Sequence, residues 1–576
     1  MRADVYFANA ESGFAELEPH WSAAAVKYKH VPRIGLILGA SQLFRWQAFV
    51  MQALDRREVE VPTLLVHSNS ESSSRLRESV VSVWRSIDRG VANRSLRLPD
   101  PLTVLDVRQF FKAANWQTTQ GCSELLSNAQ IEHLHNSNLD VLLQLGCERV
   151  HEEAKKCARQ GLWFCRFGQE LDRHADIGLF LALQRGAVIE TSLGAVDGEH
   201  LRVFRRCCIA LTDYSLFRSQ ARMYWQAADA LVQELVKLPA QSIVRLPQAL
   251  HEAPPASAPA HIQRRPSSMA VLSTVARKQA ARVFRHALGH ESWQIGLRRR
   301  RALSWSDYIS PDLTGFVRVS SPRASFLADP FLAEFQGRHF IFCEEFPYAS
   351  RKGVISCMEV EDDLTVSRPL VVLERPYHLS YPMMFWFRGE LFLIPETVHN
   401  RTIELYRCVG LPDRWQLDTV LLDGFAGIDS TILEQDGRFW LFTCRRDVRS
   451  DTSDDLHIFF ADDLRGPWHP HARNPVLCDV RTARGAGSFI RVDGHLLRPS
   501  QDGSRSYGWR INFNSVLVVS ETEYAEQVCG HADGRWSPDT AGAHTWNVDS
   551  KFEVIDGPMW LPKWKTRSRL PSWRRL

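Results

Sequence analysis

FLADPFLAEFQGRHFIFCEE, residues 326–345, joins two apolar runs through a tight glycine turn, and it is the first of four such units. The others are YPMMFWFRGELFLIPET (381–397), IDSTILEQDGRFWLFTCR (428–445) and GAGSFIRVDGHLLRPSQD (485–502). Successive turn glycines are 52, 48 and 57 residues apart, at Gly337, Gly389, Gly437 and Gly494. Each period has room for a hairpin plus two further short strands, the size of a propeller blade. With a weaker fifth unit, built from INFNSVLVVS (511–520) and the segment around His544, the pattern predicts a five-bladed β-propeller.

Counting outward from each turn glycine predicts which residues face one another across a hairpin. If the first strand of each hairpin lines the central axis, the polar groups of several blades meet at one mouth of the channel. Carboxylates from separate blades around such a pit suit acid/base or nucleophilic chemistry on sugars. The count sets Asp329 opposite Glu345, Pro382 opposite Glu396, Asp429 opposite Arg445, and Gly487 near Ser500, beside Arg498, Gln501 and Asp502.

Some of these acidic residues also have a purely structural interpretation. Asp436 and Asp493 precede turn glycines, so we interpret them as structural residues of the hairpin turns. Asp329 and Asp429 instead lie inside apolar runs, where an unpaired carboxylate would be costly. A functional role and a turn-capping role both stay open for these two residues, as they do for Glu396 and Glu345.

The four units and their surroundings carry a family resemblance. LADPFL, SYPMMF with IPET, GIDSTILEQDG, HARNPV, LLRPSQDGSRSYG and GAHTWNVDSKFEVIDG resemble the propeller domain at the N-terminus of plant glucosamine inositolphosphorylceramide transferases and its bacterial relatives. That domain is similar in turn to the five-bladed glycosidases of the arabinanase, xylosidase and levansucrase kind. The resemblance implies that Asp329 is the nucleophile or base, with Asp429 and Glu396 in the tuning and acid roles. In the hypothesis of a sugar site in the propeller, the expected substrate-binding residues are Glu345, Arg445, Arg498, Gln501, Asp502 and His544.

Composition narrows the class of protein. A length of 576 residues with 44% hydrophobic composition allows two or more domains with proper cores. A net charge of +4 is small for this length, so it does not indicate binding to nucleic acid. Residues 1–31 contain no uninterrupted apolar h-region, so we expect no signal peptide, and no stretch has the length of a membrane span. The 12 cysteines lack CxxC spacing, which favours reduced thiols and a cytoplasmic location, and no metal site is expected.

The first third of the chain alternates apolar strands with helical patterns. The expected strands are residues 34–38, VPTLLVH (61–67), LTVLDV (102–107) and LDVLLQLG (139–146). This alternation predicts an α/β domain with a largely parallel sheet. Ligands approach the carboxyl ends of such strands, here near Gly39 and Gly146.

A second resemblance covers this region. NLDVLLQLGCERVHEEAKKCARQGLWFCRFG (138–168) and LFRSQARMYWQAADALVQEL (216–235) resemble the formyltransferase fold of surface-glycan clusters. The resemblance implies Asn, His and Asp residues that move a formyl group from formyl-tetrahydrofolate onto an amine. Here Arg166, Phe167 and Gln169 stand at the expected His and acidic positions. His174, Asp172 and Asp176 in the following loop either substitute for them or belong to a solvated loop. We therefore expect a degenerate formyltransferase-like domain, which would use formyl-tetrahydrofolate only if it is active.

Two basic segments flank the propeller region. HEAPPASAPAHIQRRPSSMA (251–270) is typical of a semi-extended linker, and residues 276–303 show a basic helical pattern that ends in the run Arg298–Arg301. The tail KWKTRSRLPSWRRL (563–576) is also basic and aromatic. Solvated faces or peripheral contact with an anionic membrane would explain both segments.

The predicted organisation is an N-terminal extension (1–31), a formyltransferase-like Rossmann-type α/β domain (32–248), linker and basic helix (249–303), propeller (304–560) and basic tail (561–576). The favoured function is a carbohydrate-active enzyme of bacterial surface-glycan or glycolipid synthesis, acting on a sugar or nucleotide-sugar in the propeller, with transfer favoured over hydrolysis. The alternatives are N-formyl transfer to an amino sugar, with the propeller as a glycan-recognition module, and a non-catalytic adaptor.

Overall fold

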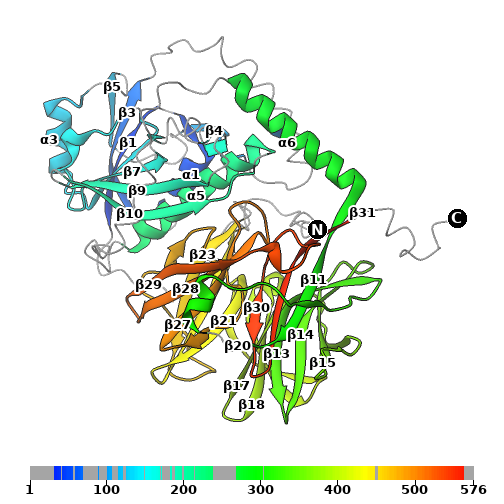
Figure 1. The fold of residues 1–576 in the computed structure, drawn as a ribbon. Helices are drawn as coiled ribbons and strands as arrows, with labels where there is room; N and C mark the ends of the chain where they lie inside the picture. The colour runs from blue at the N-terminus through cyan, green and yellow to red at the C-terminus, as the bar shows by residue number, and fades with distance from the viewer. Residues whose placement is uncertain are drawn as a thin grey trace. The chain divides into compact units, whose positions relative to one another are not determined.

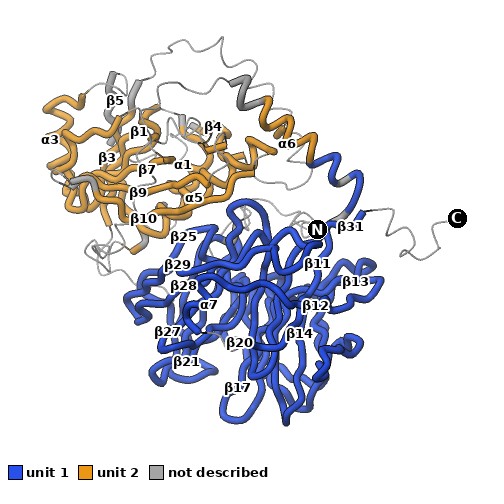
Figure 2. The backbone as a smooth tube through the Cα atoms, viewed as in Figure 1, with its two compact units in different colours: residues 1–22, 282–447, 452–576 blue, residues 23–281, 448–451 orange. Residues whose placement is uncertain are grey.

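The chain divides into two compact units (Figure 2). The computed structural model describes residues 32–40, 42–55, 59–68, 88–89, 100–106, 115–120, 125–147, 149–168, 170–171, 179, 182–183, 188–197, 200–212, 214–237, 268–301, 304–447 and 452–562. The N-terminal unit comprises residues 23–281 and 448–451, and the propeller unit comprises residues 1–22, 282–447 and 452–576. Within the described residues, no helix is both long and apolar enough to cross a membrane.

The N-terminal unit is built on one eight-stranded sheet with the order β10-β9-β7-β6-β1-β3-β5, and β8 pairs with β7. Strands β5, β3, β1, β6 and β7 are parallel, whereas β8, β9 and β10 pair antiparallel. The strands are β1 (Arg33–Leu38), β3 (Glu60–Ser68), β5 (Asn115–Gln120), β6 (Val141–Leu145), β7 (Leu162–Phe167), β8 (Glu170–Leu171), β9 (Ile189–Asp197) and β10 (His200–Ile209).

One predicted strand of this unit lies elsewhere. LTVLDV contributes β4 (Val104–Asp106), which pairs with β2 (Gln42–Phe44) in a separate two-stranded sheet. Val104 is 50% exposed, so this short run lacks the burial of a central parallel strand. The place beside β3 belongs to β5, whose sequence NWQTTQ is too polar to be recognised as a buried strand.

The helices of this unit are α1 (Arg45–Asp55), α3 (Asn128–Asn136), the 3-10 turn η4 (Glu152–Ala154) and α5 (Leu216–Lys237). Helix α3 begins with a capping box, in which the Ser127 hydroxyl accepts from the Gln130 amide and the Gln130 side chain accepts from the Ser127 amide. Helix α5 packs against α1, β9 and β10. Its inward side chains include Ala221, Tyr224, Trp225 and Ala228.

The propeller unit contains five consecutive small sheets, which confirms the prediction of five blades (Figure 1). Blade one is β13 (Ser325–Phe335), β14 (Arg338–Pro347), β15 (Val354–Val360) and β16 (Leu370–Leu373). Blade two is β17 (Ser380–Phe387), β18 (Glu390–Glu396), β19 (Thr402–Gly410) and β20 (Arg414–Asp423). Blade three is β21 (Gly427–Gln435), β22 (Arg438–Asp447), β23 (Thr452–Ala461), β24 (His469–Pro470) and β25 (Leu477–Cys478). Blade four is β26 (Ile490–Val492), β27 (His495–Asp502), β28 (Arg510–Val519) and β29 (Tyr524–Ala532).

The fifth blade differs from the prediction. It combines β11 (Gly289–Arg299) and β12 (Val317–Arg318) with β30 (Trp546–Val548) and β31 (Phe552–Pro562), and β11 runs beside β31 over its whole length (Figure 1). INFNSVLVVS is instead β28 of blade four. The basic helical pattern ends early as well, because α6 (Ser268–Leu288) gives way to β11. Residues 292–298 of β11 are all buried, so this strand is covered on both faces, which an exposed basic helix would not be.

Apolar clusters between neighbouring blades close the ring. Ile295, Phe552 and Val554 of blade five pack with Leu327 and Ile341 of blade one. Related clusters join blades one to three, three to four, and four to five. Fully burying one such side chain stabilises the fold by about 1.5–3 kcal/mol. The short element η8 (Gly534–Trp536) lies between blades four and five, whereas α7 (Trp305–Ile309) and η7 (Val398–Asn400) lie between strands of blades five and two.

Arg298, the first residue of the predicted basic run, is part of this closure. It is buried and paired with Glu553, and its guanidinium also donates to the carbonyls of Asp312 and Thr314 at 2.7 and 2.9 Å. Its guanidinium lies 4.2 Å from the Phe316 ring centroid. Arg298 is therefore a structural cation of the fifth blade and is not on a solvated face.

The hairpin register departs from the prediction by two residues, for two reasons. Each turn is a two-residue loop with positive φ at both positions, such as Gln336 (52°) and Gly337 (75°), so the fold axis lies before the glycine. Asp436 and Asp493 occupy the first position of such turns, as predicted. The first strands of blades one to three also contain an irregularity in their pairing, for example between Ala328 and Phe331. The observed partners are Leu327 for Glu345, Ser380 for Glu396, Gly427 for Arg445 and Gly485 for Ser500.

Candidate functional site

The inner strands of blades one to three share an unusual backbone feature. Asp329, Tyr381 and Asp429 stand at equivalent places in these pairing irregularities, and all have positive φ, of 51°, 42° and 48°. A left-handed conformation costs a non-glycine residue roughly 1–2 kcal/mol. Strain repeated at equivalent positions of three blades is typical of a functional site, because the surrounding structure must be built to maintain it.

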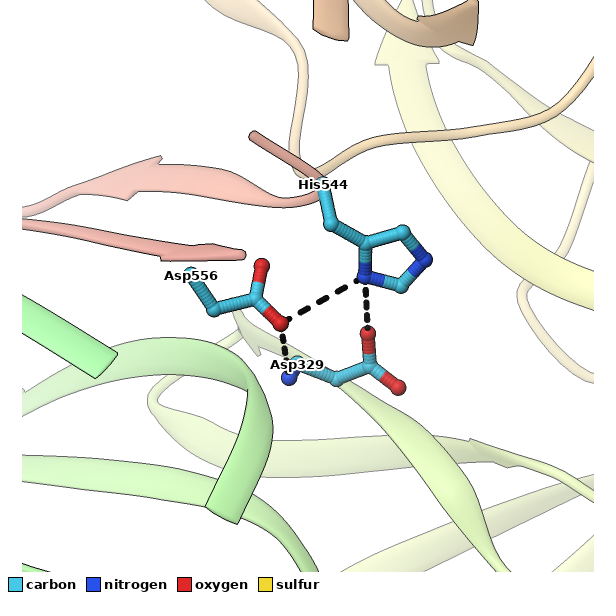
Figure 3. Close-up of side chains that lie close together, drawn as sticks. All are labelled: Asp329, His544 and Asp556. Atoms are coloured by element: carbon cyan, nitrogen blue, oxygen red, sulfur yellow. Dashed lines mark hydrogen bonds and ion pairs between the residues drawn. The ribbon is translucent and has the colours of Figure 1, made fainter. Parts of the chain in front are cut away.

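The first predicted catalytic residue, Asp329, forms a buried cluster with His544 and Asp556 (Figure 3). His544 Nδ1 lies 3.1 Å from Asp329 Oδ1 and 3.4 Å from Asp556 Oδ2. The Asp329 amide donates to Asp556 Oδ2 at 2.9 Å, and the Thr545 amide donates to Asp556 Oδ1 at 2.7 Å. Blade one and blade five therefore meet through a shared set of hydrogen bonds.

The cluster contains an ion pair on the central side of the blades. Burial opposes a charged imidazole, but the charge of Asp556 and hydrogen bonds to both carboxylates raise the pKa of His544 to about 10. Burial would likewise raise the pKa of Asp329, yet the hydrogen bond and charge of His544, with the charge of Arg484, hold it below its usual value. Near neutral pH, His544 is an imidazolium and Asp329 is an ionised carboxylate.

Asp429 of blade three is held by two groups from blade four. Arg484 Nε donates to Asp429 Oδ2 at 2.5 Å, and Gln501 Nε2 donates to the same oxygen at 2.9 Å. The Gln501 amide also donates to the Gly485 carbonyl at 2.7 Å. Asp429 is thus a fixed, charge-paired carboxylate, and the predicted residue Gln501 lies with it.

Tyr381 links the two carboxylates. Its amide donates to Asp329 Oδ2 at 3.2 Å, and its hydroxyl accepts from the Gly487 amide at 2.8 Å and lies 3.0 Å from Thr431 Oγ1. The side chain is fully buried. Through these hydrogen bonds, Tyr381 of blade two connects to blades one, three and four.

Glu396 of blade two is the predicted acid. It is 8% exposed, and its Oε2 atom has no hydrogen-bond partner among the described residues. Burial, the charge of Asp429 and a hydrogen bond to Asp429 raise the pKa of Glu396 to about 8, although Arg484 acts in the opposite direction. Glu396 is therefore mostly protonated near neutral pH, and it can donate a proton.

Glu344 completes this group, and the sequence count missed it. Glu344 faces Ala328 as Glu396 faces Ser380, so the two glutamates are equivalent in blades one and two. Burial raises the pKa of Glu344 well above its usual value, and the charges of Asp329 and Glu396 add to this effect. Its Oε1 atom lies 3.4 Å from His378 Nε2. The two adjacent glutamates of FCEE were visible in the sequence, but the register error directed attention to Glu345.

The cluster meets solvent at Tyr507, which is 47% exposed. Its ring centroid lies 4.8 Å from that of His544 and 5.5 Å from that of Trp293. The Arg484 guanidinium lies 4.9 Å from the same ring. Tyr507, Trp293, Arg484 and Asp556 were not singled out from the sequence, because they lie outside the four hairpins on which the count was based.

Four predicted binding residues lie in other surroundings. Glu345 accepts hydrogen bonds from the Ser325 and Ser356 hydroxyls at 2.7 Å each, and Asp502 accepts from Arg510 at 2.8 Å. Arg498 is buried and makes a bidentate ion pair with Glu526, at 2.7 and 2.6 Å. Arg445 lies 3.6 Å from Asp455. The contacts of Glu345, Asp502 and Arg498 join strands within one blade, which is a structural role.

The expected formyltransferase position lies at the end of β7. Phe167 is fully buried and packs against Trp46 and Tyr224, with ring centroids 6.4 and 5.3 Å away. Arg166 lies half-buried beside the Phe164 ring. Gln169, His174, Asp172 and Asp176 lie outside the described residues. The two positions that can be compared therefore contain an aromatic core residue and an arginine.

Among the described residues, Asp329, His544 and Asp556 also form a group that could hold a cation, since their ligand atoms lie within 4.8 Å of one another. Metal ligation requires a deprotonated imidazole nitrogen. The Nδ1 proton of His544 already balances the two carboxylates, so a metal ion and this proton would compete for the same place.

Comparison with known proteins places the similarity in the propeller. Residues 310–554 match the family model described as "Glucosamine inositolphosphorylceramide transferase 1, N-terminal". The chain is 32% identical over 207 residues to glucosamine inositolphosphorylceramide transferase 1 of Arabidopsis thaliana, and 31% identical over 209 residues to that of Oryza sativa subsp. japonica. These alignments cover 35% of this chain but only 27% and 28% of the plant proteins.

Two solved structures align with this chain at low similarity. Zg3597, a family 117 glycoside hydrolase of Zobellia galactanivorans, aligns at a TM-score of 0.31 and 12% identity, over 46% of this chain and 91% of its own. An exo-1,5-alpha-L-arabinanase from a bovine ruminal metagenomic library aligns at a TM-score of 0.29 and 13% identity. This alignment covers 41% of this chain and 97% of the arabinanase. The matched range 310–554 includes Asp329, Glu396, Asp429, Arg484 and His544. The propeller of this chain is therefore similar to the N-terminal part of the plant glucosamine inositolphosphorylceramide transferases.

Proposed function

We propose that this chain is a carbohydrate-active enzyme whose sugar site is the central pit of the propeller. The observation that supports this proposal is a pair of carboxyl groups whose environments push their pKa values apart. The pKa of Asp329 is lowered, whereas that of Glu396 is raised to about 8. Such a pair can serve as base and acid in one reaction.

In this proposal Asp329 is the base or nucleophile, because it is ionised and fixed by His544, Thr545 and the Tyr381 amide. Glu396 is the acid that protonates the leaving group. Asp429 keeps Glu396 protonated through its negative charge, and Arg484 and Gln501 hold Asp429 in place. These are the roles that chemistry at a glycosidic bond requires.

Only the names of the relatives indicate a substrate class. The plant proteins are named glucosamine inositolphosphorylceramide transferase 1, so we favour glycosyl transfer from a sugar or nucleotide-sugar, in glycan or glycolipid synthesis. A cytoplasmic location with peripheral contact to an anionic membrane would suit a lipid-linked acceptor. Formyl transfer by the N-terminal unit is the weaker candidate, since Phe167 is a packed aromatic residue where that chemistry needs a polar one.

The test is turnover of the full-length chain. Nucleotide-sugars with lipid or sugar acceptors, and aryl glycosides with water as acceptor, would be screened by mass spectrometry of the products. We expect product from the native chain and loss of it in Asp329→Asn and Glu396→Gln. Asp436→Asn, in a hairpin turn, is the matched control and should behave like the native chain. Unchanged turnover in both pit variants would contradict the proposal.

A further inference from the structure

Tyr507 is the most exposed of the residues assigned to the pit. It is 47% exposed, whereas Asp329, Glu396, Asp429 and His544 are each 8% exposed or less. It lies in the loop that joins β27 to β28 of blade four. An exposed tyrosine on an ordinary surface needs no explanation, but this one stands beside the carboxyl groups to which the proposed reaction is assigned.

Tyr507 contacts the partners of both catalytic carboxylates. Its ring centroid lies 4.8 Å from that of His544, which pairs with Asp329. Its hydroxyl accepts from Arg484 Nη2 at 3.3 Å, and Arg484 pairs with Asp429. A sugar bound beside the two carboxylates would therefore lie close to Tyr507.

The ring of Tyr507 is held in place without being covered by another ring. His544 and Trp293 meet it at interplanar angles of 65° and 66°, so neither lies flat on it. The His544 imidazolium and the Arg484 guanidinium, 4.9 Å from the ring centroid, are both attracted to the electron-rich ring. The next residue, Gly508, has a φ of 69°, and a Cβ atom there would lie 2.8 Å from the Trp293 side chain. Glycine thus lets the loop approach blade five, and the ring of Tyr507 is preorganised for contact.

The hydroxyl of Tyr507 has a proton to donate. Burial raises the pKa of Tyr507 well above its usual value, the charges of Asp329, Asp429 and Glu396 add to this effect, and Arg484 opposes it. The hydroxyl therefore stays protonated near neutral pH. Arg484 donates to its oxygen, and no described residue accepts its proton. This proton is available to an oxygen atom of a bound molecule.

We propose that Tyr507 binds the sugar directly: its ring packs on the C–H face of a pyranose, and its hydroxyl donates to an oxygen of the same sugar. This inference rests on the proposed sugar site and names the side chain that orients the sugar toward Asp329 and Glu396. A pyranose presents apolar C–H groups beside its hydroxyls, and an exposed aromatic ring with a polar tip matches both. Glu396 stays protonated in this arrangement, as its proposed role as the acid requires.

The experiment is saturation-transfer NMR of the full-length chain with the methyl glycosides of glucose, galactose and xylose. A perdeuterated chain with protonated tyrosine is irradiated at the tyrosine ring resonances, so only sugar protons near a tyrosine ring gain saturation. The chain has 11 tyrosines, and Tyr507→Phe identifies the one responsible. We expect transfer from the native chain to C–H protons of at least one glycoside. In Tyr507→Phe the transfer should be lost, while the deuterated phenylalanine ring still binds the glycoside within about threefold of the native affinity.

Two further variants test the ring itself. Tyr507→Ala removes the surface on which the sugar packs, so its affinity for the same glycoside should fall at least about tenfold. The matched control is Trp386→Ala, because Trp386 is 41% exposed and stacks on Phe335 with ring centroids 6.0 Å apart. Trp386 lies near the turn of its hairpin and Glu396 at the opposite end, so this variant should bind like the native chain. Melting temperatures would confirm that each variant is folded.

Three results would overturn the inference. Binding without transfer from tyrosine, or transfer that persists in Tyr507→Phe, would show that the sugar does not contact this ring. Equal affinity in the native chain and Tyr507→Ala would show that the ring does not contribute to binding. In each case, turnover that is lost in Asp329→Asn would leave the proposed sugar site standing without Tyr507. No binding of any glycoside by the native chain would count against the proposed function together with this inference.

Discussion

The end of strand β7 in the N-terminal unit and the pit of the propeller were both expected to contain catalytic side chains, and they are built in opposite ways. At the end of β7, Phe167 packs edge-on against Trp46 and Tyr224. In the pit, Asp329 is buried to a similar degree but is paired with His544 and receives the amide of Tyr381. Burial alone does not mark a site; burial of charge with a complete set of partners does.

The difference follows from how the two folds supply partners. The pit receives side chains from five separate blades, so each buried charge can meet a counter-charge from another blade, as Asp429 meets Arg484. The described part of β7 neighbours only strands of one sheet and the aromatic side chains that cover it. An apolar residue is the stable solution there.

The largest expected effect tests the pit directly. Asp329→Asn should lower kcat/KM by about a thousandfold, because the base or nucleophile loses its charge. Asparagine tolerates positive φ and retains the size of the side chain, so the fold should persist. Steady-state rates of the native chain, Asp329→Asn and Asp436→Asn measure this. A loss in Asp436→Asn of similar size would show that the effect is structural.

The converse test is at β7. Phe167→Ala should lower the local free energy of unfolding of the N-terminal unit by about 3 kcal/mol, as expected for a large aromatic residue removed from a packed core. Hydrogen exchange followed by mass spectrometry should show faster exchange in β7 and α5. Turnover or sugar binding by the propeller should be unchanged. A parallel loss of propeller activity would show that the two units are not functionally separate.

A smaller effect with a specific pH signature is expected at Glu396. An acid must be protonated to act, and the pKa of Glu396 is about 8, so the rate should fall as pH rises through about 8. Glu396→Gln should lower kcat by about a hundredfold below that pH and remove this alkaline limb. The pH–rate profile of both forms measures it. An alkaline limb that persists in Glu396→Gln would assign the titration to another group, such as His544.

The sequence predicted the elements of the propeller better than their register. The four glycine turns and five blades are present because Gly at the second turn position and apolar alternation are local signals. The facing pairs were wrong by two residues, because the count was centred on the turn glycine instead of between the two turn residues, and because the pairing irregularity after Ala328 is not visible in single residue types. Glu344 was missed for this reason.

The fifth blade and the partners of the site could not be predicted for a different physical reason. Strand β11 pairs with β31, more than 250 residues away in the chain, and that contact is made only when the ring closes. The cluster of Asp329, His544 and Asp556 depends on the same closure. Local patterns identified Asp329 and His544 as candidates, but the carboxylate of Asp556 that joins them is brought in by the tertiary fold.

The smallest expected effect comes from adding a methyl group at Gly485, where the pit has little free space. A Cβ atom there would lie 3.0 Å from the Asp429 carbonyl oxygen and 3.1 Å from the Tyr381 hydroxyl, so Gly485→Ala should push these groups apart by a few tenths of an ångström. We expect kcat to fall about tenfold, since small misplacements of catalytic groups are costly. In the control Gly503→Ala, the nearest atom is a methyl group of the Val480 side chain at 3.3 Å, and that group can move. The propeller tolerates added volume where neighbouring side chains can adjust. The pit depends on the placement of individual polar atoms, which the packed end of β7 does not. Equal rates in Gly485→Ala and Gly503→Ala would show that this contrast does not hold.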